Sequence, residues 1–182
     1  KTKTIIRLGS YNVSHNLENL ILSTAYFPTN YKLILAGVSY NNYYEKLKFL
    51  IKKNNLKKVT LLKDVNYSKW FEILKKGDLG IAFYDPVNTS HKNMAGTSQK
   101  FNNYLLAGIP CLVNKNEDFI KFNKKYNVLY IQQKNSPQQI AKKITQIFKD
   151  KKIYRKKVMN SKKLFFEKLN FENQYKKLEM YI

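Results

Sequence analysis

The segment of residues 97–110, TSQKFNNYLLAGIP, combines groups that could bind a phosphorylated ligand. Thr97 and Ser98 place hydroxyl groups just before a predicted helix, whose first backbone N–H groups and positive end attract anions. Lys100 adds a cation in the first turn, and Asn103, one turn further on, can donate to and accept from hydroxyl groups. Together these groups suit a sugar nucleotide. An ordinary capped helix with a surface lysine is the alternative interpretation.

Other motifs of enzyme chemistry are absent from the sequence. Nothing matches G-x-G-x-x-G, G-x-x-x-x-G-K-[ST] or G-x-S-x-G. Two histidines and one cysteine are too few for a structural zinc site, and with no cofactor motif in the sequence we expect no cofactor. Cys111 lies in an apolar run and is predicted to be a core residue, and a single cysteine excludes an internal disulfide.

Short β-rich runs alternate with amphipathic segments and so predict the elements that position these residues. We expect strands at residues 4–8, 31–36, 59–62, 79–83, 110–113 and 127–131, and helices at about residues 17–25, 43–53, 67–76, 99–106, 137–149, 151–163 and 170–180. This alternation predicts a Rossmann-like three-layer α/β sandwich with a mostly parallel six-stranded sheet and helices on both faces. A C-terminal helical extension completes one domain over residues 1–182.

Ligands of such sheets bind at the carboxyl ends of the strands, near the point where the strand order reverses. The loops expected to line a site therefore cover residues 9–16, 37–42, 63–66 and 84–100.

The chain is strongly basic, with 34 Lys and Arg against 12 Asp and Glu, a net charge of +22. Such a charge attracts polyanions. Only Arg7 and Arg155 are arginines, which disfavours a nucleic-acid reader, and the abundance of Lys, Asn, Ile and Tyr also fits an AT-rich genome. Lysines crowd the last third of the chain, as a solvated face or as a patch for peripheral contact with an anionic membrane.

The ends of the chain bear on its location and completeness. No apolar run approaches the ~20 residues of a membrane helix, and the first residues lack the apolar segment of a signal peptide. We therefore expect a cytoplasmic protein, with a peripheral position on the inner face of the cytoplasmic membrane left open. The chain starts at Lys1 without a Met, which predicts a piece of a longer protein.

The segment 97–110 resembles the donor-site signature of GT-B glycosyltransferases of the family-4-like group (glycosyl transferases group 1). That signature runs roughly S/P-x-K-h-x-E-Y-h-A-x-G-h-P, where h is apolar. Similarity to other family segments extends over nearly the whole chain, at residues 9–21 (GSYNVSHNLENLI), 33–37 (LILAG), 78–81 (DLGI) and 171–175 (FENQY). The resemblance implies the C-terminal, donor-binding domain of a two-domain enzyme.

What the resemblance implies for function is a bacterial glycosyltransferase. It would transfer a sugar from a nucleoside-diphosphate sugar to a saccharide or lipid-linked acceptor of a surface polysaccharide or glycolipid, without a metal. This chain alone, without the N-terminal domain, would bind the nucleotide and transfer nothing. The implied donor-binding residues are Gly9, Ser10, His15, Val65 beside the base, Thr97 and Ser98 at the phosphates, Lys100 as their counter-charge, and Asn103 at hydroxyl groups.

The sequence also departs from the family pattern. Family members usually carry Arg after the first-loop glycine, Lys five residues later and Glu on the helix, where this chain has Ser10, His15 and Asn103. His15 is the one candidate for a catalytic residue. Two other classes stay open: a non-catalytic basic α/β module that binds anionic membrane or nucleic acid, and a GT-B-fold sugar-nucleotide epimerase or degenerate glycosyltransferase half.

Overall fold

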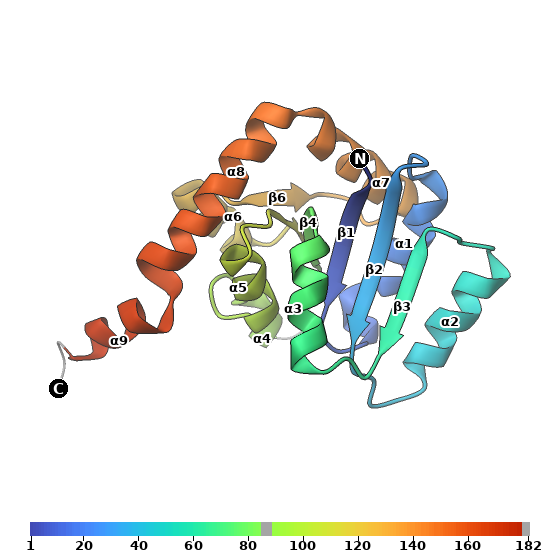
Figure 1. The fold of residues 1–182 in the computed structure, drawn as a ribbon, viewed down its shortest axis with the longest axis horizontal. Coiled ribbons are helices and arrows are strands. Elements are labelled where there is room, and N and C mark those ends of the chain that lie inside the picture. The colour runs from blue at the N-terminus through green and yellow to red at the C-terminus, as the bar shows by residue number, and fades with distance from the viewer. Residues whose placement is uncertain (85–88, 180–182) are drawn as a thin grey trace.

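In the computed structural model, which describes residues 1–84 and 89–179, one parallel sheet runs in the order β3-β2-β1-β4-β5-β6 (Figure 1). Every strand pairing within these residues is parallel, so the sheet is entirely rather than mostly parallel. The predicted α/β fold is confirmed. The strands are β1 (Lys3–Leu8), β2 (Tyr31–Gly37), β3 (Val59–Lys63), β4 (Leu79–Ala82), β5 (Cys111–Asn114) and β6 (Leu129–Gln132).

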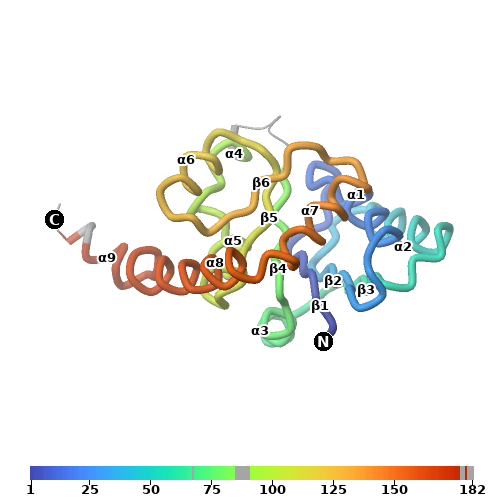
Figure 2. Tube along the Cα trace, turned by 90° about the horizontal axis from the view of Figure 1, so that it is seen from above, coloured from blue at the N-terminus to red at the C-terminus, as the bar shows by residue number. Residues whose placement is uncertain are grey.

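Helices cover both faces of the sheet (Figures 1 and 2). One apolar cluster joins Ile5, Leu33 and Leu112 to residues of α1, α2 and α7. A second joins Ile6, Ala36 and residues of α3, α5 and α6 to the end of α8. The helices are α1 (Leu17–Leu22), α2 (Tyr43–Lys53), α3 (Tyr67–Lys76), α4 (Thr89–Lys92), α5 (Gln99–Leu106), α6 (Glu117–Tyr126), α7 (Pro137–Lys149), α8 (Lys151–Leu164) and α9 (Phe171–Glu179).

The C-terminal extension predicted from the sequence is formed by α8, a π-helical turn over Phe165–Leu169, and α9. The extension leads away from the sheet, so that α9 lies outside the α/β body in both views (Figures 1 and 2). Among the described residues, no helix is long and apolar enough to span a bilayer.

The strand order reverses between β1 and β4, and α5 packs tightly over this point. The two strands pair only at Ile5 with Leu79 and at Ile6 with Gly80. Just beyond, the hydroxyl of Tyr104 on α5 accepts a hydrogen bond from the N–H of Leu8 at 2.9 Å. Gly80 makes room for this ring, because an added Cβ would lie 2.5 Å from Tyr104 Cδ2. The N-terminus of α5 is thereby fixed beside the carboxyl end of β1.

The sequence interpretation missed α6, whose signals lie at its start. The side chain of Asn116 accepts hydrogen bonds from the N–H groups of Asp118 and Phe119, at 2.7 and 3.2 Å. Glu117 and Asp118 also place negative charge in the first turn, where the helix dipole favours it. The short α4 was missed as well, and the helix expected over residues 17–25 is α1 followed by a 3-10 turn over Ser23–Tyr26.

Candidate functional site

The candidate site lies where the loop after β1 meets the N-terminus of α5. Both segments stand at the carboxyl edge of the sheet, at the reversal of strand order between β1 and β4. This is where open α/β sheets bind ligands. Of the residues predicted for a donor site, the structure gathers Gly9, Ser10, His15, Ser98 and Lys100 here.

Lys100 is a buried cation at the centre of this site. Its side chain crosses Gly9, where an added Cβ would lie 3.0 Å from the lysine Cε and 3.7 Å from Nζ. The residue is only 8% exposed, and no described carboxylate lies within ion-pair distance of it. Burial and then the nearby charge of Arg7 lower the Lys100 pKa well below its usual value. A bound anion would supply the counter-charge that the protein does not.

The N-terminus of α5 presents backbone donors to the same place. Ser98 is the N-cap, and its Oγ accepts from the N–H of Phe101 at 3.3 Å and shares a 2.5 Å hydrogen bond with the hydroxyl of Tyr84. The N–H groups of Gln99 and Lys100 have no acceptor among the described residues. The hydroxyl of Ser98 is therefore used in hydrogen bonds within the protein. The N–H groups of Gln99 and Lys100 are available to hydrogen-bond an anion.

Arg7 is a member of the site that the sequence analysis did not identify. Its side chain lies under the loop after β1, where Nη1 donates to the carbonyl of Gly9 and Nη2 to that of Ser10, both at 2.6 Å. Nη2 also lies 2.7 Å from Nδ1 of His15. The residue is 1% exposed, in a strand that also holds the buried apolar residues Ile5, Ile6 and Leu8. A lone arginine in such a strand was the available signal, since buried charges need partners or a function.

The contact with Arg7 fixes the protonation state of His15. A guanidinium nitrogen can only donate, so at 2.7 Å Nδ1 accepts and the neutral ring carries its hydrogen on Nε2; Nδ1 then does not donate to the carbonyl of Ser10, which lies 3.3 Å away. Burial, followed by the charges of Lys100 and Arg7, lowers the pKa of His15 to about 3. His15 is therefore a neutral hydrogen-bond donor. It does not supply the positive charge of the lysine that family members usually carry in this loop. Its Nδ1 already accepts from Arg7 and so does not act as a general base.

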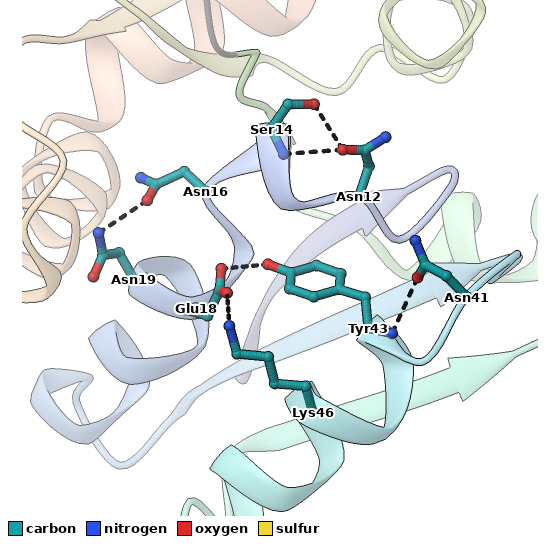
Figure 3. A network of polar contacts seen from close by, with 8 residues as sticks. All are labelled: Asn12, Ser14, Asn16, Glu18, Asn19, Asn41, Tyr43 and Lys46. Atoms are coloured by element: carbon teal, nitrogen blue, oxygen red, sulfur yellow. Dashed lines mark hydrogen bonds and ion pairs between the residues drawn. The ribbon is translucent and has the colours of Figure 1, made fainter.

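The outer side of the same loop is held by a polar network (Figure 3). Asn12 caps the short turn over Val13–His15 by accepting from the backbone and hydroxyl of Ser14, at 3.0 and 2.9 Å. Glu18 on α1 accepts from the hydroxyl of Tyr43 and from Lys46, both on α2. The loop is thus held by its own cap at Asn12 and by Arg7, and the helix that follows it, α1, is joined to α2 through Glu18.

The remaining predicted residues are placed differently. Thr97 is exposed, and its hydroxyl donates to the carbonyl of Asn93 at 2.7 Å. The Nδ2 group of Asn103 is buried without an acceptor among the described residues, so one donor is available one turn beyond Lys100. Val65 lies after β3 and packs against the second apolar cluster, with β2 between its strand and β1.

The chain belongs to the family of glycosyl transferases group 1, whose model matches residues 1–164. The fold and the match confirm the resemblance to the C-terminal domain of GT-B glycosyltransferases. No curated protein matches the chain in sequence.

Solved structures share the fold at low sequence identity. The catalytic domain of the cholesterol-α-glucosyltransferase from Helicobacter pylori superposes with a TM-score of 0.66 and 17% identity, over 91% of this chain and 99% of that one. HepE from Anabaena, in complex with UDP and glucose, superposes with a TM-score of 0.77 and 14% identity. The match covers 99% of this chain but only 48% of the HepE chain. The C-terminal domain of LpcC from Francisella tularensis superposes with a TM-score of 0.71 and 16% identity, over 93% of this chain and 87% of that one. The chain thus spans about half of the HepE chain.

Proposed function

We propose that this chain is the nucleotide-sugar-binding domain of a bacterial glycosyltransferase. In the longer protein it would transfer a hexose from a nucleoside-diphosphate sugar to a saccharide or lipid-linked acceptor of a surface polysaccharide or glycolipid. Family membership supports glycosyl transfer in general, and the HepE structure holds UDP and glucose on a similar fold. The acceptor and a catalytic base for it belong, in this proposal, to an N-terminal domain.

The observation that carries the proposal is the uncompensated positive charge around Lys100. Arg7 and Lys100 are both buried at the carboxyl edge of β1, and neither forms an ion pair with a described carboxylate. Each is expensive to bury without a partner anion. A diphosphate would supply that anion, with the first N–H groups of α5 as further donors.

In this proposal the domain acts by stabilising the leaving group. Lys100 neutralises the charge that develops on the diphosphate as the glycosidic bond breaks, and no metal is required. Arg7 acts through the loop: it holds the carbonyls of Gly9 and Ser10 inward and is a positioning residue. The Nδ2 group of Asn103 is a donor for a ribose or sugar hydroxyl.

The test is thermal and urea unfolding of the chain with UDP, GDP, dTDP and CMP and with their sugar conjugates. At ~100 times its Kd, the correct ligand should stabilise the fold by about 2.7 kcal/mol. Selectivity for one nucleotide would identify the base. Absence of stabilisation by every ligand would contradict the proposal.

Substitution of Lys100 sharpens this test, because binding and stability should change in opposite directions. Lys100→Met keeps the volume and removes a buried, unpaired cation beside Arg7. It should stabilise the ligand-free chain by about 1–3 kcal/mol and abolish stabilisation by nucleotide. Lys52→Met, on the exposed surface of α2, should change neither quantity and is the matched control. A loss of ligand-free stability in Lys100→Met would assign Lys100 a structural role.

An epimerase that uses the same anion site is the second candidate, since it also binds a nucleoside diphosphate. Product analysis of the longer protein with the identified sugar nucleotide separates the two. Transfer of the sugar to an acceptor supports a glycosyltransferase, and release of an isomeric sugar contradicts it.

A further inference from the structure

A second basic site lies at the opposite, amino edge of the sheet. A groove of about 560 Å³ runs between α7 and α8, and Lys143, Asp150, Ile153, Lys156 and Lys157 line it. Its place is fixed by Tyr154 of α8, whose hydroxyl donates at 2.8 Å to the carbonyl of Asp78, just before β4 begins. The Lys100 site at the carboxyl edge is therefore on the other side of the sheet.

The floor of this groove contains a buried cation and a buried hydroxyl. Lys157 is only 5% exposed, and its Nζ donates to Oδ1 of Asn127 at 2.6 Å and lies 5.1 Å from the ring centre of Tyr130. No described carboxylate lies within ion-pair distance of Lys157. The hydroxyl of Tyr130 is also buried, without a hydrogen-bond partner among the described residues. Two groups at the floor thus have unused hydrogen-bond donors.

Like charges around Lys157 increase the demand for an anion. Burial, followed by the charges of Lys143 and Lys156, lowers the pKa of Lys157 to about 8. The acidic residue in the groove, Asp150, is the N-cap of α8 and accepts from the N–H of Ile153 at 2.9 Å. Three lysines face one carboxylate that already has a partner, so the groove is complementary to a phosphate group.

Apolar side chains accompany this charge, one in the groove and one in the depression beside it. On α8, Ile153 is 46% exposed and Met159 is 71% exposed. Met159 lies with Lys152 and Arg155 in an adjoining depression of about 670 Å³, and Lys156 lines both hollows. Exposed apolar residues among basic ones on one helix are typical of surfaces that bind anionic lipid, where the apolar groups enter the headgroup region.

We propose that the groove between α7 and α8 binds the phosphate of an anionic phospholipid headgroup and so docks the amino edge of the sheet on a negatively charged membrane. Ile153 and Met159 enter the lipid, and the carboxyl edge with Lys100 faces away from it. This docking does not depend on the proposed donor site, since it uses no residue of that site.

The test is co-sedimentation of the chain with vesicles of phosphatidylcholine, with and without phosphatidylglycerol. The chain should bind only the anionic vesicles, and less strongly as salt rises. Lys143→Gln/Lys156→Gln should lower binding roughly thirty-fold, from about 1 kcal/mol per lysine. Lys52→Gln/Lys53→Gln removes the same charge from α2 and is the matched control. An equal loss in both double variants would mean diffuse attraction and would overturn the proposal.

Further arms separate a lipid from other polyanions. Ile153→Ser/Met159→Ser should weaken vesicle binding, whereas Lys100→Met should bind vesicles as the unmodified chain does. The side-chain NMR signal of Lys157 should shift when anionic vesicles are added. A shift with inorganic phosphate but none with vesicles would make free phosphate the ligand. Binding of duplex DNA that depends on Lys143 and Lys156, without vesicle binding, would indicate nucleic acid; either result overturns the proposal.

Discussion

The ammonium group of Lys100 lies 4.7 Å from the ring centre of Tyr84. The ring of Tyr84 thus contacts a cation, Lys100, that forms no ion pair with a carboxylate among the described residues. The attraction between a desolvated cation and an aromatic face contributes about 2 kcal/mol. Tyr84 therefore offsets part of the cost of burying Lys100 and leaves the ammonium available to an anion.

The hydroxyl and the ring of Tyr84 should have separable effects. Tyr84→Phe removes only the hydrogen bond to Ser98, so we expect a loss of about 1 kcal/mol in unfolding free energy and unchanged binding of nucleotide. Tyr84→Leu also removes the ring face and should cost about 2 kcal/mol more. Urea unfolding measures both. The cation–π part of this difference should disappear in a Lys100→Met background, and an undiminished difference would contradict the contact.

Arg7 should be far more important for stability than the other arginine of the chain. Arg7→Met leaves the carbonyls of Gly9 and Ser10 and Nδ1 of His15 without their donor, which should cost about 3 kcal/mol or more of unfolding free energy. Arg155→Met, at an exposed position on α8, should cost less than about 0.5 kcal/mol. The pKa of His15, followed by NMR, should rise in Arg7→Met. Similar unfolding midpoints for the two variants would rule out the anchoring role.

Because of His15, the free energy of unfolding of the chain should decrease at acidic pH. Its pKa is about 3 in the folded chain, against about 6.5 when unfolded, so the unfolded chain binds one proton more between these values. The contribution of His15 is complete above about pH 6.5 and is lost as the pH falls towards 3, at about 1.4 kcal/mol per unit. His15→Asn keeps an acceptor for Arg7 and removes the titration. Urea unfolding between about pH 4 and pH 6 should show a shallower pH slope for this variant, and identical slopes would contradict a buried neutral His15.

The packing of Tyr104 against Gly80 should appear as non-additive mutational effects. Gly80→Ala forces a Cβ into the Tyr104 ring and should cost about 1–3 kcal/mol. Tyr104→Phe keeps the ring but leaves the N–H of Leu8 unsatisfied, at a similar cost of about 1–3 kcal/mol. In a Tyr104→Ala background the ring and its Cγ are gone, and Gly80→Ala should become nearly neutral. Additive free energies in that cycle would show that the contact is loose.

Helices with clear periodicity and caps were predictable from the sequence, and the residues of the site were predictable only in part. The helices over residues 43–53, 67–76, 99–106 and 137–149 have the expected bounds, because apolar spacing and caps are local signals. The meeting of Gly9 and Lys100 followed from the general rule for parallel sheets. The role of Arg7 did not follow from any rule, because it depends on contacts between its side chain and the carbonyls of the loop after β1. The spacing of residues in the sequence does not predict such tertiary contacts.

The floor of the groove between α7 and α8 was equally hidden. Its lysines appeared in the sequence as part of one basic stretch, without any distinction between solvated and buried members. Only the packing of α8 against Asn127 and Tyr130 separates Lys157 from its exposed neighbours. The sequence thus predicted the charge, and the fold determines which of the charges lack a counter-ion.

The hydrogen bond from Leu8 to Tyr104 joins residues 96 positions apart in the chain. Contacts of such separation form late in folding, because the intervening loop must close first. The loop after β1 is synthesised early, yet it can bind an anion together with Lys100 only after β4 and α5 have docked beside it. A growing chain that ends before α5 would therefore have no affinity for nucleotide. The moment at which nucleotide binding appears would show when β4 and α5 dock beside β1.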